Sequence, residues 1–241
     1  MAYFVKNDIS IYYEDSGEDL PALLILAPGG MKSSLDFWQN TPWDPRKELF
    51  QKYRVIAMDQ RNAGRSAAPV TDKDGWQSYI RDQIGLMDYL GIDKFNLAGM
   101  CIGGPYCLGI IEAVPNRVIS ATIFQTIGLD DNREAFYRLF DEWADEVGLR
   151  ENNIRQEAFG AFRTNMFGSN KVFFNLDESF LPTCNTPLLV LMGDDLFHPR
   201  SSSELIVNNA PNTQLINSWK DGEARDAAIL KCEQFLDDYN H

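Results

Sequence analysis

The chain has 241 residues, of which 44% are hydrophobic, 12% aromatic and 24% charged, a composition typical of a globular α/β domain and not of a disordered chain. Its formal net charge of −13 argues against nucleic acid and anionic membrane surfaces as partners, because both attract basic surfaces. No stretch approaches the roughly 20 apolar residues that span a bilayer. The start of the chain lacks the pattern of a signal peptide, so we expect a cytoplasmic protein.

Apolar runs of strand length alternate with segments of helical period along most of the chain. Two short antiparallel strands are predicted within 4–15, and further strands at 22–27, 53–59, 95–99, 117–125, 187–193 and 213–217. Helices are predicted in the aromatic-rich stretch before 53–59, near 80–90, and at 105–114, 201–210 and 223–239. This alternation predicts an α/β fold with a mostly parallel sheet and helices on both faces.

The segment 127–184 breaks that alternation. It contains two helical patterns, at 133–148 and 154–168, with no strand of comparable quality between them. An insertion between two parallel strands lies above the carboxyl edge of the sheet, where open α/β sheets bind ligands. We therefore predict an α/β core formed by 1–126 and 185–241, and a small helical lid formed by 127–184.

A cysteine lies between two glycines where the strand 95–99 gives way to a helix, in the sequence "NLAGMCIGGPY". A strand, a sharp turn and a helix with Gly-x-Cys-x-Gly at the turn is the pattern of a nucleophile elbow. The positive end of the following helix lowers the pKa of a thiol at that position. Cys101 is therefore the candidate nucleophile, and the N–H of Ile102 is a candidate donor to an oxyanion.

The other cysteines, Cys107, Cys184 and Cys232, are expected to act as small hydrophobic residues. They form no CxxC pair and no metal-ligand spacing with the two histidines of the chain. The stretch "GMCIGG" lacks the spacing of a dinucleotide-binding fingerprint. We expect neither a metal nor a cofactor.

Two further motifs, "ILAPGGMKSS" at 25–34 and "MDQRNAGRS" at 58–66, precede the elbow. With these three motifs in order, the chain resembles the α/β-hydrolase family over nearly its whole length. The resemblance implies that Gly30, or else Met31, donates the second hydrogen bond of an oxyanion hole. It gives Asp59 and Arg61 an architectural role and no catalytic one.

The family pattern also implies an acid after the strand 187–193 and a histidine after the last strand. A cysteine nucleophile occurs in a minority of the family, such as the dienelactone hydrolases. Asp194 and Asp195 follow 187–193, and we favour Asp195; Asp130 or Asp131 is a substitute.

No histidine follows the last strand, which departs from the family pattern. His241 is the terminal residue, so His198 is the candidate base, three residues beyond Asp195.

The predicted lid is rich in aromatic residues that would cover Cys101 with a mainly apolar cavity. We expect Met31, Trp38, Phe140 and Trp143 to contact a small-molecule substrate, with Phe37 beside them. The first hypothesis is hydrolysis of a small, fairly apolar ester, lactone or thioester through a thioester on Cys101. The alternatives are a ligand-binding protein without hydrolytic activity, and an acyltransferase or lyase on the same fold. The oligomeric state is open.

Overall fold

The computed structural model describes residues 2–17, 19–150 and 156–240. Eight strands form one sheet in the order β1-β2-β4-β3-β5-β6-β7-β8. The strands are β1 Ala2–Lys6, β2 Ile9–Asp15, β3 Ala22–Leu26, β4 Arg54–Met58, β5 Phe95–Met100, β6 Val118–Phe124, β7 Leu188–Leu191 and β8 Thr213–Ile216. β1 and β2 pair antiparallel, β2 pairs antiparallel with β4, and all other pairs are parallel. The predicted strands and the mostly parallel sheet are confirmed.

The central strands β3 and β5 are buried along their whole length, because helices pack on both faces of the sheet. One hydrophobic cluster joins the sheet to α2 Trp76–Tyr89, α3 Gly103–Ala113 and α6 Arg200–Asn209. The other joins the opposite face to the 3-10 helix η2 Leu35–Asn40, to Trp43 and Leu49 on either side of α1 Pro45–Glu48, and to α7 Gly222–Tyr239. No helix within the described ranges is long and apolar enough to cross a membrane.

The prediction of one helix in the aromatic-rich stretch before β4 is wrong. The structure has two 3-10 helices there, η1 Gly30–Lys32 and η2, followed by the four-residue α1. Pro42 and Pro45 explain the difference, because each lacks an N–H and disfavours helical backbone in the residue before it.

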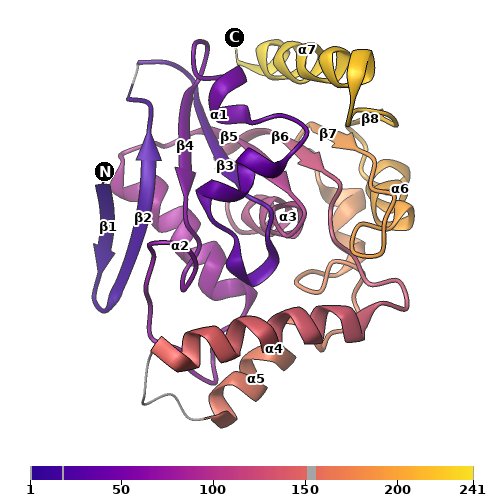
Figure 1. Ribbon diagram of the computed structural model, residues 1–241. Coiled ribbons are helices and arrows are strands. Elements are labelled where there is room, and N and C mark those ends of the chain that lie inside the picture. Colours follow the sequence, from indigo (N-terminus) through magenta and orange to yellow (C-terminus); the bar gives the residue numbers. More distant parts are fainter. Residues whose placement is uncertain (1, 18, 151–155, 241) are drawn as a thin grey trace.

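The segment between β6 and β7 contains α4 Arg133–Arg150, α5 Gln156–Phe167 and the 3-10 helix η3 Glu178–Thr183. The start of the second predicted helix, 154–155, lies outside the described residues. Figure 1 shows α4 and α5 side by side across the edge at which the parallel strands end. The indole of Trp143 in α4 donates to the carbonyl of Asn62 (3.0 Å), and Phe140 packs edge-on against it. These contacts place the helices over the edge that carries Cys101.

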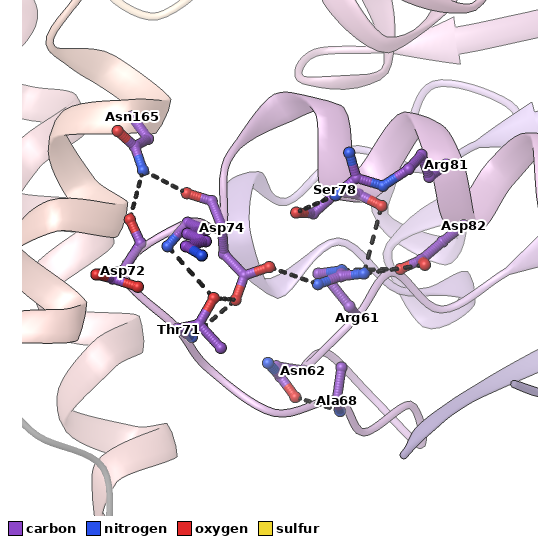
Figure 2. Close-up of polar contacts among 11 residues, drawn as sticks. Arg61, Asn62, Ala68, Thr71, Asp72, Asp74, Ser78, Arg81, Asp82 and Asn165 are labelled. Atoms are coloured by element: carbon purple, nitrogen blue, oxygen red, sulfur yellow. Dashed lines mark hydrogen bonds and ion pairs between the residues drawn. The ribbon is translucent and has the colours of Figure 1, made fainter. Parts of the chain in front are cut away.

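The motif "MDQRNAGRS" has the architectural role that the resemblance implied. The guanidinium of Arg61 binds the carboxylates of Asp74 (2.7 Å) and Asp82 (2.8 Å), and all three side chains are buried (Figure 2). The carbonyls of Asp72 and Asp74 accept hydrogen bonds from Asn165 of α5 (3.0 and 2.8 Å). This network joins the loop after β4, helix α2 and the inserted helices.

Candidate active site

Cys101 follows β5 directly and has left-handed backbone, with φ +61°. The turn requires glycine on both sides of it. A Cβ on Gly99 would lie 2.3 Å from the carbonyl oxygen of Gly103, and a Cβ on Gly103 would lie 2.5 Å from that of Leu26. Close approach of the strand and the helix therefore fixes the Gly-x-Cys-x-Gly pattern. The left-handed backbone at Cys101 turns its side chain toward the edge of the sheet.

The thiol of Cys101 lies at the start of α3, where backbone N–H groups are free. Burial would raise the pKa of this thiol. The charge and hydrogen bonding of His198, together with the backbone N–H groups of Gly29 and Ile102, outweigh burial and lower the pKa below its ordinary value. The site therefore stabilises the thiolate. By contrast, burial raises the pKa of the thiols of Cys107 and Cys232, in accord with their predicted role as hydrophobic residues.

His198 lies in the loop between β7 and α6, with 12% of its side chain exposed. Its Nδ1 atom is 2.8 Å from both carboxylate oxygens of Asp195. Its Nε2 atom is buried and has no hydrogen-bond partner among the described residues, and His198 lines the same cavity as Cys101. Burial would lower the pKa of His198, but the Cys101 thiolate and the Asp195 carboxylate raise it to about 9.

Backbone hydrogen bonds hold the Asp195 carboxylate in position for its contact with His198. Its Oδ1 atom accepts the backbone N–H groups of Phe197 and His198, both at 3.0 Å. Two of the other candidate acids are engaged elsewhere. Asp194 pairs with Lys220, and Asp130 accepts a hydrogen bond from Ser201 (2.8 Å). The structure thus brings Cys101, His198 and Asp195 together.

Trp219 occupies the loop after β8, where the family pattern has its histidine. Its indole donates to the carbonyl of Met192 (2.9 Å) and packs edge-on against Phe124. The loop is therefore filled by a buried aromatic side chain. His241 lies outside the described residues.

The loop that carries Asp195 and His198 is held by Asn132, which precedes α4 and was not predicted from the sequence. The Nδ2 atom of Asn132 donates to the carbonyls of Leu196 (2.7 Å) and Gly128 (2.9 Å). Its Oδ1 atom accepts the N–H of Asp130 (3.0 Å), and the side chain is 4% exposed. Asn132 therefore ties the loop after β7 to the chain that leads into α4.

A cavity of about 300 Å³ opens above the Cys101 sulfur. Most of its lining residues are apolar. They are Gly29, Gly30, Met31, Lys32, Phe37, Cys101, Ile102, Ile127, Phe136, Leu139, Glu142, Phe167, Phe197 and His198. Met31, an expected substrate contact, and Gly30, an expected oxyanion donor, both line the cavity. Gly29 was not predicted, yet its N–H is the one that reaches the sulfur together with that of Ile102.

Three of the predicted substrate contacts are wrong. Trp38 packs on the other face of the sheet, edge-on against Phe124. Phe140 and Trp143 are fully buried against Phe162 of α5.

The spacing within α4 explains the error. Residues 136, 139 and 142 line the cavity, whereas 140, 143 and 147 lie on the adjacent face and are buried in the core. The aromatic wall is formed instead by Phe136, with Phe167 stacked at 5.3 Å and Phe197 edge-on at 5.4 Å.

These features define a hydrolase of the α/β-hydrolase type, and the comparison with known families agrees. The family model described as "alpha/beta hydrolase fold" matches residues 22–232, so the chain belongs to that family.

Among curated proteins, the chain is similar to a "Putative carbamate hydrolase RutD" from Caulobacter sp. strain K31, with 30% identity over 74% of this chain and 78% of the relative. It is also 29% identical, over 48% of this chain and 39% of the relative, to a 2-hydroxymuconate semialdehyde hydrolase from Pseudomonas putida.

Among solved structures, the meta-cleavage product hydrolase CumD from Pseudomonas fluorescens IP01 superposes with a TM-score of 0.73 at 21% identity, covering 100% of this chain and 98% of the other. The enol-lactonase from Burkholderia xenovorans LB400 gives 0.71 at 19% identity, covering 98% and 99%. At these identities the likeness establishes the fold.

Proposed function

We propose that the chain hydrolyses a small, fairly apolar ester, lactone or thioester through a thioester intermediate on Cys101. The observation that carries the proposal is that Cys101 and His198 line one cavity, with the ring of His198 held by Asp195 at 2.8 Å. The pKa of the thiol is lowered and that of the imidazole is raised to about 9, and both shifts favour the thiolate–imidazolium form of the pair. A thiolate attacks an acyl carbon without first losing a proton to a base.

In the first half-reaction the Cys101 sulfur attacks the acyl carbon, and the carbonyl oxygen becomes an oxyanion. In this proposal the N–H groups of Ile102 and Gly29, which lie beside the sulfur, donate to that oxyanion, and Gly29 takes the role that the family resemblance implied for Gly30. His198 then donates its Nε2 proton to the leaving oxygen or sulfur as the acyl–heteroatom bond breaks. Asp195 holds the ring through Nδ1 and stabilises the imidazolium.

In the second half-reaction the neutral His198 accepts a proton from water. The hydroxide attacks the thioester, the sulfur leaves as a thiolate, and the acid product is released while His198 is again charged. Hydrolysis is favoured over ligand binding alone because Asp195 and His198 supply the acid–base function within one loop. The curated relatives named as a carbamate hydrolase and a 2-hydroxymuconate semialdehyde hydrolase support hydrolysis of a small carbonyl compound.

The proposal is tested with aryl and thiol esters of graded acyl length, followed by intact-mass measurement of rapidly quenched enzyme. We expect an acyl adduct on Cys101 and loss of turnover in Cys101→Ala. Cys232→Ala, which removes a thiol on the other face of the sheet, is the matched control and should keep its activity. Turnover that persists in Cys101→Ala would overturn the proposed intermediate.

A further inference from the structure

The entrance of the cavity above Cys101 carries more negative than positive charge. Lys32 and Glu142 line the cavity; Glu142 is exposed to solvent and Lys32 is half-buried. Glu146 lies one helical turn beyond Glu142 on α4, and its carboxylate forms an ion pair with the Lys32 ammonium. The single lysine of the cavity wall is therefore already neutralised by a partner outside the wall.

Glu142 has no such partner. Within the ranges that the structure describes, no ion pair involves its carboxylate. Of the remaining lining residues only Cys101 and His198 are titratable, and a thiolate and an imidazolium at these two positions add no net charge. The rim therefore presents one net negative charge to an entering molecule.

A substrate carboxylate entering this cavity would meet Glu142, with Lys32 held by Glu146. Between the rim and the ring of His198 the walls are apolar, with Met31 and Phe136 among them, and offer a carboxylate no cationic partner on the way in. Removing the hydration of a charge without a replacement partner is costly. An uncharged acyl chain of a substrate loses little hydration free energy at the rim, and its burial against the aromatic wall favours binding.

We propose that Glu142 and Glu146 determine the charge selectivity of the cavity, so that it takes uncharged acyl substrates and rejects those carrying a carboxylate. This inference deepens the proposed function, because it concerns the substrate of the same site. Glu142 acts directly as a negative charge at the rim. Glu146 acts by neutralising Lys32.

The test uses two alkylating reagents that differ in charge. Iodoacetamide is neutral and iodoacetate is anionic, and the rate of Cys101 modification by each is measured by mass at low salt. The attraction of iodoacetate to the His198 imidazolium is common to all variants, so it cancels when the iodoacetate-to-iodoacetamide ratio of a variant is compared with that of the wild type. We expect Glu142→Gln and Glu146→Gln each to raise the iodoacetate-to-iodoacetamide ratio about threefold, the effect of one unit charge at a few ångströms in water.

The double variant should raise the ratio about tenfold, and high salt should abolish most of the change. Glu134→Gln, on the same helix and outside the cavity lining, is the matched control and should leave the ratio unchanged. An unchanged ratio in the double variant, or an equal rise in the control, would overturn the inference. Alkylation requires no turnover, so this outcome is separate from the acyl-adduct experiment that tests hydrolysis.

Discussion

Replacing Asn132 by alanine should loosen the loop that carries Asp195 and His198. The substitution removes two donated hydrogen bonds, of 2.7 and 2.9 Å, and one accepted hydrogen bond of 3.0 Å. Each hydrogen bond contributes about 0.5–1.5 kcal/mol, and a buried carbonyl left without a donor adds to the loss. We expect the free energy of unfolding to fall by about 2–4 kcal/mol.

The change at the active site follows from the same contacts. With Leu196 released, the ring of His198 spends less time beside the Cys101 sulfur. Burial then raises the pKa of the thiol, because the imidazolium no longer offsets it. The rate of iodoacetamide modification at neutral pH should fall about tenfold for each unit by which that pKa rises above the pH.

Two measurements check this prediction: urea unfolding, and the pH profile of Cys101 alkylation. Asn165→Ala is the control, since it removes two hydrogen bonds to backbone carbonyls at a distance from the loop after β7. It should leave the alkylation profile unchanged. If Asn132→Ala lowers stability and keeps the wild-type alkylation profile, Asn132 does not position His198.

Two further predictions concern the core and the pH dependence. Arg61→Ala leaves the buried carboxylates of Asp74 and Asp82 without their cation, and should lower the free energy of unfolding by about 3–5 kcal/mol; a loss below about 1 kcal/mol in urea unfolding would contradict the buried network. Ester hydrolysis should rise with pH through the lowered pKa of Cys101, and fall above about pH 9 as His198 loses the proton that it donates to the leaving group. A rate that keeps rising beyond pH 10 would show that His198 is not the acid.

Much of the fold could be predicted from the sequence because its signals are local. Continuous apolar runs such as 22–27 and 95–99 give strands buried on both faces, and the order of strands and helices restricts the sheet to a mostly parallel one. The elbow was predictable for the same reason, since Gly99 and Gly103 lie two positions on either side of Cys101 and meet a steric requirement of that turn.

The cavity lining could not be predicted in the same way. Phe136 and Phe140 are both apolar positions of one amphipathic helix, and only the packing of α4 on α5 decides which faces the cavity. Asn132 was missed because its partners depend on how two distant loops meet. His198 was found by elimination, since the chain has only two histidines.

The most direct test of the central claim is the pKa of the Cys101 thiol in the wild type and in His198→Ala. Thiolate formation is followed by absorbance near 240 nm or by alkylation rate, with Cys101→Ala as the blank. We predict a pKa below the ordinary thiol value in the wild type, and one above it in His198→Ala, where burial acts without an opposing charge. The same pKa in both proteins, at the value of a free thiol, would contradict the thiolate–imidazolium pair.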